Sequence, residues 1–138
     1  MSFDVFLNFD GDCRNALEFY SQVFKLEMPA NIMTYGQAPG FQALPDAKDR
    51  VLYASLPIFG CNVMFSDCPP GSKYVKGSNI ALTLGSHDAK EIERLFVALK
   101  TGGMVNMDLG KTFFSELYAM VTDRFGVTWQ LSLSPFKN

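Results

Sequence analysis

The chain has 138 residues, of which 48% are hydrophobic and 14% aromatic, enough apolar material for one compact domain with a sizeable core. Its formal net charge is −2 and the charged residues are scattered, which argues against nucleic acid or an anionic membrane as a partner. No apolar run approaches the roughly 20 residues that span a bilayer, and the N-terminus lacks the regions of a signal peptide, so we expect a cytoplasmic protein.

The first half of the chain predicts a strand, a helix and three further strands. Apolar residues recur at helical spacing from Cys13 onward, and Asp12 is a suitable N-cap. Pro29 makes the second strand either an edge strand or one that starts late. The predicted elements are, in order, a strand at 3–9, a helix at 13–25, a strand at 27–35, a loop at 36–48, and a hairpin of strands 50–56 and 61–67 that turns over 57–60.

A segment rich in proline and glycine, residues 68–77, predicts the linker to a second half of similar composition. We place module one at about residues 1–68 and module two at about residues 78–138. The predicted elements of the second module are a strand at 79–84, a helix that starts at 86–88 and stops before Gly102-Gly103, and strands at 104–109, 117–122 and 127–133.

The two halves resemble each other in sequence. Tyr53-Ala54 recurs as Tyr118-Ala119 at an offset of 65 (118 − 53), and residues 3–24 resemble residues 78–99 at an offset of 75 (78 − 3). A repeat usually means that one unit cannot bury its apolar face alone. We therefore expect an α+β fold of two βαβββ modules in one domain, with both helices on one face of an eight-stranded, curved, mixed sheet.

Strand alternation predicts where a cleft lies. Alternate residues of a strand point to opposite faces, so Val5, Leu7 and Phe9 belong to the helix-covered face and Phe6 and Asn8 to the open face. The open face mixes polar and apolar residues, which suits a concave cup for a small molecule. The alternative is that these residues face bulk water; we favour the cup, because a duplicated sheet with both helices on one side tends to curl around its other side. The candidate ligand-binding residues are Asp4, Phe6, Asn8, Met64, Asn79, Phe113, Phe114 and Gln130.

Phe113 and Phe114 precede the strand predicted at 117–122. Neighbouring side chains of a regular strand point to opposite faces. We therefore expect one of the two rings to pack beneath the sheet and the other to border the cup or a dimer interface, where an aromatic ring offers a large contact area.

Other candidate sites are weaker. The three cysteines, Cys13, Cys61 and Cys68, are odd in number and lack CxxC spacing, which predicts reduced thiols. The only histidine, His87, lies at a predicted helix start, where a solvated turn residue is the simplest interpretation. No Ser-His-Asp or Cys-His set can be assembled, so we assign no catalytic residue.

Several segments resemble the vicinal oxygen chelate superfamily, which includes glyoxalase I, extradiol dioxygenases and bleomycin-resistance proteins. One is Phe9-Asp10-Gly11, followed by the helix with Ala16-Leu17-Glu18-Phe19-Tyr20. Residues 120–129, with the sequence MVTDRFGVTW, resemble the PhnB-like branch, often labelled 3-demethylubiquinone-9 3-methyltransferase. The resemblance covers nearly the whole chain and implies paired βαβββ modules, commonly assembled as a homodimer.

The resemblance also implies four inward positions where the superfamily's enzymes hold a divalent metal with His and Glu. In this sequence the positions fall on Asp4, Met64, Asn79 and Gln130. Met, Asn and Gln are poor ligands for such an ion, so we expect a vestigial site without metal or cofactor. The methyltransferase label is not supported either, because the usual fold for that activity is a doubly wound sheet with a Gly-rich turn.

Three functions remain open on the sequence. The first is a metal-free cup that holds a small, partly apolar molecule between the modules. The second is a metal-independent enzyme of the superfamily, with Asp4 or Glu116 as a base. The third is a structural dimer with a vestigial cleft. We favour the first, because no residue pair in the sequence indicates acid–base chemistry.

Overall fold

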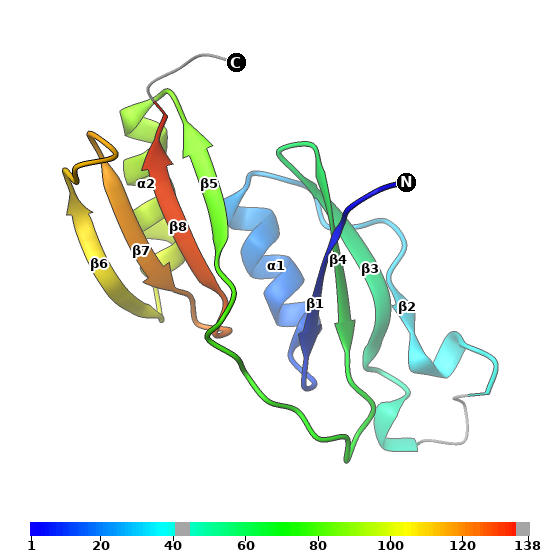
Figure 1. The fold of residues 1–138 in the computed structure, drawn as a ribbon. Coiled ribbons are helices and arrows are strands. Elements are labelled where there is room, and N and C mark those ends of the chain that lie inside the picture. Colours follow the sequence, from blue (N-terminus) through cyan, green and yellow to red (C-terminus); the bar gives the residue numbers. More distant parts are fainter. Residues whose placement is uncertain (41–44, 135–138) are drawn as a thin grey trace. The chain divides into compact units, whose positions relative to one another are not determined.

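The chain forms two compact units, Met1–Val75 and Lys76–Asn138, each of which is one βαβββ module (Figure 1). The computed structural model describes residues 1–40 and 45–134. Part of the loop predicted at 36–48 therefore lies outside the described residues. No helix in the described part of the chain is long and apolar enough to cross a membrane.

The first module holds a four-stranded mixed sheet in the order β1-β4-β3-β2. β1 pairs with β4 in parallel, and the other pairs are antiparallel. Its elements are β1 (Val5–Phe9), α1 (Cys13–Val23), β2 (Met33–Thr34), short 3-10 helices at Tyr35–Gln37 and Pro45–Ala47, β3 (Val51–Ile58) and β4 (Cys61–Asp67).

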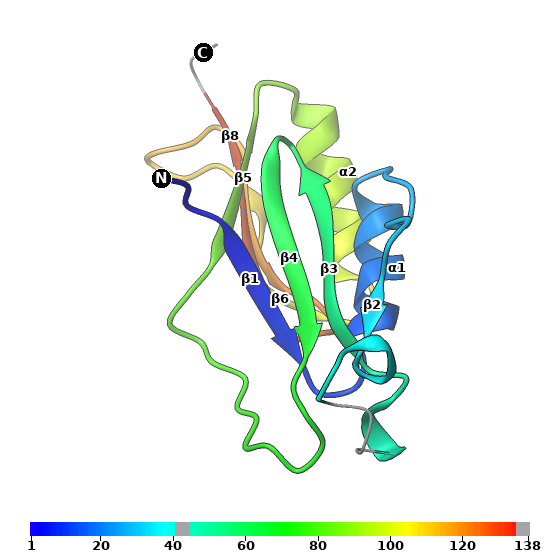
Figure 2. The same cartoon turned by 90° about the vertical axis from the view of Figure 1, so that its right-hand side faces the viewer.

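The core of the first module follows from the helical spacing of α1. Ala16, Leu17 and Tyr20 are fully buried, because this spacing places them on one side of the helix. The Tyr20 ring lies 5.8 Å from the ring of Phe65 on β4, which in turn stacks on Phe9 of β1 at 6.1 Å. In Figure 2 the helix lies against one face of this sheet, as the sequence predicts.

Two strands of the first module differ from the prediction. β2 has two residues instead of the nine expected over 27–35. It ends because the chain turns into a 3-10 helix at Tyr35–Gln37, and Pro29 lacks the N–H that a strand ladder needs. β3 is longer than expected, because the hairpin turns only at Phe59 and Gly60, whose φ angles of 48° and 82° suit a tight two-residue turn.

The second module repeats this architecture in the order β5-β8-β7-β6. Its helix is capped by Asp88, whose side chain accepts a hydrogen bond from the Lys90 backbone N–H at 2.9 Å. Ile92, Leu95 and Leu99 of the helix are buried. The elements are β5 (Leu82–Ser86), α2 (Ala89–Lys100), β6 (Met104–Gly110), β7 (Tyr118–Thr122) and β8 (Thr128–Leu133).

The α+β class, the two βαβββ modules and the mixed strand directions predicted from the sequence are confirmed. The eight strands are divided into two four-stranded sheets.

The offset of 75 predicted between the first strands of the two modules is wrong by two residues. β1 starts at Val5 and β5 at Leu82, an offset of 77 (82 − 5), and the pairs Phe6↔Met64 and Thr83↔Gln130 give the same value (83 − 6).

Candidate functional site

The expected cup residues come from both modules, and each module presents one sheet face that its helix does not cover. In the first module the alternation predicted for β1 is confirmed, since Phe9 is buried while Phe6 and Asn8 are exposed. Phe6 lies beside Met64 of β4, and Met64 lies beside Ser55 of β3. This face therefore carries a row of mixed polar and apolar side chains, the composition typical of a ligand surface.

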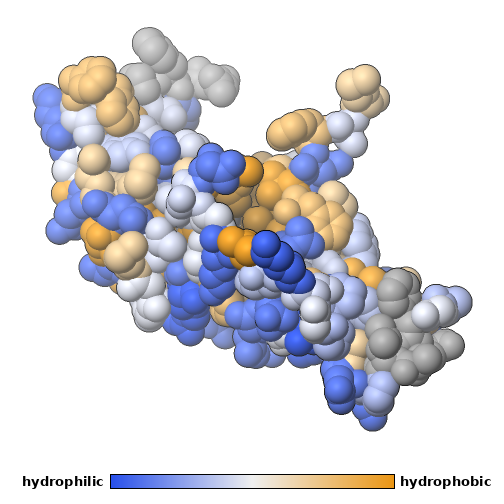
Figure 3. Space-filling view, turned by 60° about the horizontal axis from the view of Figure 1, so that its bottom comes forward, coloured by the Kyte–Doolittle hydropathy of each residue, from blue (hydrophilic) through white to orange (hydrophobic). Residues whose placement is uncertain are grey.

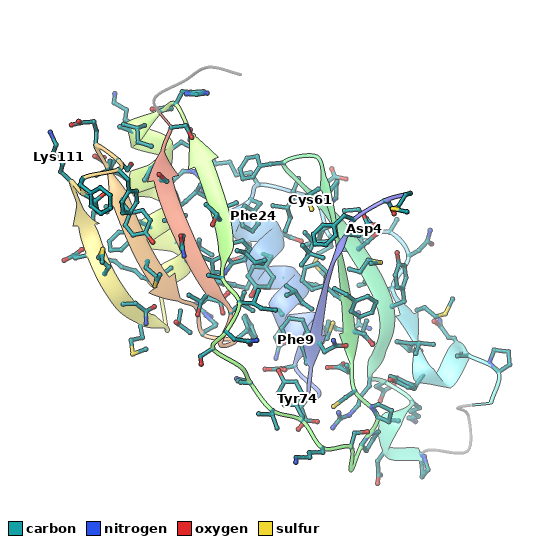
Figure 4. All side chains as sticks on the ribbon, viewed as in Figure 1. Asp4, Phe9, Phe24, Cys61, Tyr74 and Lys111 are labelled. Carbon is teal, nitrogen blue, oxygen red and sulfur yellow. The ribbon has the colours of Figure 1, made fainter. Side chains whose placement is uncertain are left out.

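Asp4 and Asn8 lie at the two ends of β1. Asp4 directly precedes the strand (Figure 4), is exposed, and accepts a hydrogen bond from the Ser2 hydroxyl at 2.9 Å. The backbone carbonyl of Asn8 accepts a hydrogen bond from the Tyr74 hydroxyl at 3.0 Å. Tyr74 thus ties the segment that leaves the first module to the edge strand β1 of its sheet.

The open face of the second module has three rows of side chains across its strands. The middle row is Thr83, Gln130, Met120 and Met107. On one side of it the Thr122 hydroxyl lies 2.9 Å from the Asn106 amide oxygen and 3.1 Å from the Thr128 hydroxyl. On the other side lie Ser132 and Tyr118, which are neighbours in the β7–β8 ladder. The face is therefore polar at one end and aromatic at the other.

Asn79 lies apart from this arrangement. It is exposed and precedes the first residue of β5 by three positions. The residue across from Gln130 is Thr83. The sequence offset of 75 makes Asn79 the counterpart of Asp4. The strand pairing instead makes Thr83 the counterpart of Phe6, because each lies beside the matching residue of its module's last strand, Gln130 and Met64.

The turn between β6 and β7 lines a pocket of about 420 Å³. Phe114 meets Tyr118 edge-on with ring centroids 5.0 Å apart, and Phe113 meets Phe114 in the same way at 5.1 Å. Lys111 lies at the start of this turn (Figure 4). The lining residues are Lys111, Thr112, Phe113, Phe114, Ser115, Glu116, Leu133 and Ser134.

The expectation that one of the two phenylalanines packs beneath the sheet is wrong. Phe113 is 101% exposed and Phe114 is 54% exposed. The alternation rule does not apply to them, because residues 111–117 form a turn and not a strand. Tyr118, which the sequence marked as part of the repeat but not as a site residue, is the buried member of this aromatic group and anchors it to the open face.

The four positions carried over from the superfamily do not fit a metal ion in this chain. A thioether and two amides are poor donors for a divalent ion, and the carboxylate of Asp4 is exposed and bonded to Ser2. Among the described residues, no three His, Cys, Asp or Glu side chains are arranged to hold a metal ion together.

Two buried carboxylates have structural partners. Asp67, 2% exposed, accepts hydrogen bonds from the backbone N–H groups of Gly11, Cys13 and Val51 at 2.8, 3.0 and 2.9 Å. In the second module Asp123 accepts a hydrogen bond from the Trp129 indole at 2.8 Å. These carboxylates organise the fold of their modules.

The three cysteines are free thiols. Burial raises the pKa of Cys13 far above its ordinary value. Burial, and then the hydrogen bond to the Asp10 carboxylate at 3.4 Å, raises the pKa of Cys68. Both groups are therefore held in the protonated form, which is the unreactive one. His87 is exposed and its Nδ1 lies 2.9 Å from the carbonyl oxygen of Ser134.

Comparison with known proteins identifies the family of this chain. Its sequence matches the family described as 3-demethylubiquinone-9 3-methyltransferase over residues 2–132. The chain belongs to this family. It is 29% identical over 143 residues to Protein YjdN of Escherichia coli (strain K12), covering 96% of this chain and 95% of YjdN.

Two solved structures of the same fold are similar over nearly their whole length. Protein PA1353 from Pseudomonas aeruginosa is 33% identical with a TM-score of 0.86, covering 97% of this chain and 98% of that one. The putative PhnB protein from Bacillus cereus is 26% identical with a TM-score of 0.81, covering 97% and 100%. A glyoxalase-related enzyme from Fulvimarina pelagi, 18% identical with a TM-score of 0.59 and covering 98% of this chain and 90% of that one, shares the fold.

The family's name does not transfer a mechanism. Two four-stranded mixed sheets are a different architecture from the doubly wound sheet that places a nucleotide-like cofactor at a Gly-rich turn. The exposed side chains are therefore a better guide to function than the family's name. On the face seen in Figure 3, apolar side chains lie in small groups among polar ones.

Proposed function

We propose that this glyoxalase-like protein binds a small, partly apolar molecule on the open faces of its sheets, without a metal ion. The observation that carries the proposal is the aromatic pocket of about 420 Å³ at the end of the second module's open face. Its volume lies within the range of about 300–1,000 Å³ typical of ligand pockets. Its lining combines two phenylalanine rings with hydroxyl groups, which is the usual composition of such a site.

Binding suits this surface better than acid–base chemistry does. The two carboxylates that the sequence offered as bases, Asp4 and Glu116, are both exposed and bonded to a neighbour: Asp4 to the Ser2 hydroxyl and Glu116 to the Lys111 ammonium at 3.1 Å. A general base is more effective when burial brings its pKa toward the working pH. The hydroxyl groups of Thr112 and Ser134, which line the pocket, offer hydrogen bonds that orient a ligand without ionising.

We also propose that the protein acts in the cytoplasm as a homodimer. Support for pairing comes from β6, an edge strand on which Met104, Val105 and Met107 are all exposed. Unpaired strand edges with apolar side chains are templates for association. The free thiols are consistent with a reducing compartment.

Titration with the uncharged dye Nile red, which fluoresces in apolar sites, tests the binding proposal. We expect saturable binding to the folded protein, weakened about five-fold or more by Phe114→Ala, since a single aromatic anchor contributes roughly 1–2 kcal/mol. Glu93→Ala, on the exposed side of α2, is the matched control and should leave binding unchanged. Absence of saturable binding, or an equal loss in both variants, would contradict the proposal.

A further inference from the structure

The rim of the aromatic pocket carries one basic and one acidic side chain. Lys111 Nζ lies 3.1 Å from Glu116 Oε2, and the two side chains are 70% and 74% exposed. An ion pair this exposed contributes little to stability. The pair can therefore open at little cost when each of its charges finds a partner on a ligand.

The turn that presents these charges is held in place by its own hydrogen bonds. The Thr112 N–H donates to the Ser115 carbonyl at 2.9 Å, and the Ser115 N–H donates to the Thr112 hydroxyl at 3.0 Å. The buried Ser115 hydroxyl lies within hydrogen-bond distance of two carbonyl oxygens, that of Leu117 at 2.8 Å and that of Leu133 in β8 at 3.1 Å. A turn that is ordered before binding loses less entropy when a ligand arrives.

The aromatic part of the pocket offers contact with a flat ring. Tyr118 is 6% exposed and fixes the position of Phe114, which is half-exposed and meets Tyr118 edge-on. Rings prefer offset-stacked or edge-to-face neighbours with centroids about 4.5–7 Å apart. Phe113 and Phe114, themselves edge-on at 5.1 Å, leave their outer surfaces available for a further ring.

Charge then decides which ring-bearing molecules bind best. Among the residues that the structure describes, Lys111 and Glu116 are the two ionisable ones that line the pocket, and their formal charges cancel. An anionic ligand would be attracted by Lys111 but repelled by Glu116. A cationic ligand would be attracted by Glu116 but repelled by Lys111. A molecule that carries both an ammonium and a carboxylate satisfies both side chains.

We infer that the pocket selects small aromatic zwitterions, such as amino acids with an aromatic side chain, over ring-matched anions and cations. The inference rests on the proposed binding function and names the class of its ligand. The lysine and the glutamate determine specificity, and the phenylalanines supply the contact area.

A ring-matched series of probes tests this selectivity. The probes are L-phenylalanine, hydrocinnamate and phenethylamine, which are a zwitterion, an anion and a cation. Binding is followed by amide chemical shifts of residues 112–116 in isotope-labelled protein. We expect L-phenylalanine to bind about three- to ten-fold more tightly than either singly charged probe, the effect of about 0.6–1.4 kcal/mol from one exposed charge contact.

Charge-reversal variants test the assigned roles. Glu116→Lys should make hydrocinnamate the tightest probe, and Lys111→Glu should make phenethylamine the tightest. Glu93→Lys on α2 makes the same charge change as Glu116→Lys at a site away from the pocket. This control should preserve the wild-type order of the three probe affinities. Circular dichroism of each variant checks that the fold is retained.

The outcomes separate this inference from the proposed function. If wild-type protein binds hydrocinnamate or phenethylamine as tightly as L-phenylalanine, the zwitterion inference is overturned. If no probe shifts these amides but Nile red still binds and responds to Phe114→Ala, the ligand class is wrong and the binding function stands. If Nile red also fails to bind, both are wrong.

Discussion

Replacing Asp67 by asparagine should destabilise the first module by about 2–4 kcal/mol. Oδ1 of this buried carboxylate accepts two backbone N–H groups, from Gly11 and Cys13, and Oδ2 accepts a third, from Val51. Asparagine has nearly the same shape, but one of its two oxygens becomes an NH₂ donor. Whichever way the amide is turned, at least one backbone N–H then faces another donor in a buried site.

The magnitude follows from these bonds. A buried donor left without a partner costs about 1–3 kcal/mol. The remaining hydrogen bonds lose their ionic character, and bonds to a charged acceptor are roughly twice as strong as neutral ones. For a chain of this length a loss of 2–4 kcal/mol corresponds to a decrease of roughly 8–16 °C in the melting temperature.

Urea unfolding followed by circular dichroism measures the effect. Asp49→Asn makes the same chemical change at an exposed position and should stay within about 0.5 kcal/mol of wild type. If Asp67→Asn is as stable as Asp49→Asn, the three hydrogen bonds do not contribute as argued, and the assignment of Asp67 as the organising residue of this module is refuted.

Four further outcomes are expected. A thiol reagent should label Cys61 rapidly and Cys68 more slowly, and should label the buried Cys13 only on unfolding. The Arg50 guanidinium lowers the pKa of Asp10, so the ion pair stabilises the fold above the ordinary carboxyl pKa and is lost as pH falls through the lower folded value. The stability difference between wild type and Asp10→Asn, measured by urea unfolding, should therefore shrink below about pH 4. Zinc, nickel or manganese should not raise the melting temperature. Sedimentation at micromolar concentration should show a dimer, burying about 1,600 Å² or more; a monomer would contradict the proposed pairing.

Periodicity was sufficient to predict the helices and the faces of the strands. The apolar spacing in α1 and the alternation of Trp129 and Leu131 with Gln130 are local signals, and burial follows them. The same reasoning gave the wrong length for β2, because pairing to β3 depends on residues distant in sequence.

The error of two residues in the repeat offset left the faces correct. Side chains alternate with a period of two, so a shift of two residues keeps every side chain on its own face. The shift does change which residues are neighbours. Thr83, and not Asn79, lies across from Gln130, and this was visible only in the pairing of β5 with β8.

The turn that holds Phe113 and Phe114 and the Asp67 site escaped prediction for another reason. Both depend on contacts that leave no periodic trace in the sequence. Asp67 bonds to Gly11 and Cys13, which are 56 and 54 positions away. Phe113 and Phe114 lie in a turn, where the alternation rule for strands does not hold.

The two modules show which features a duplicated unit keeps and which it can change. The helix-facing residues of the last strands correspond at one offset, Phe65 with Leu131 (131 − 65 = 66), and both are fully buried. The buried carboxylates do not correspond, since Asp67 ends β4 whereas Asp123 follows β7. Apolar alternation is required for each module to have a core, so it is retained. Polar groups need only satisfy their own neighbours, so their positions are free to move. The open faces are under still weaker packing constraint, which explains how side chains as different as Met64 and Gln130 can occupy them without disturbing the core.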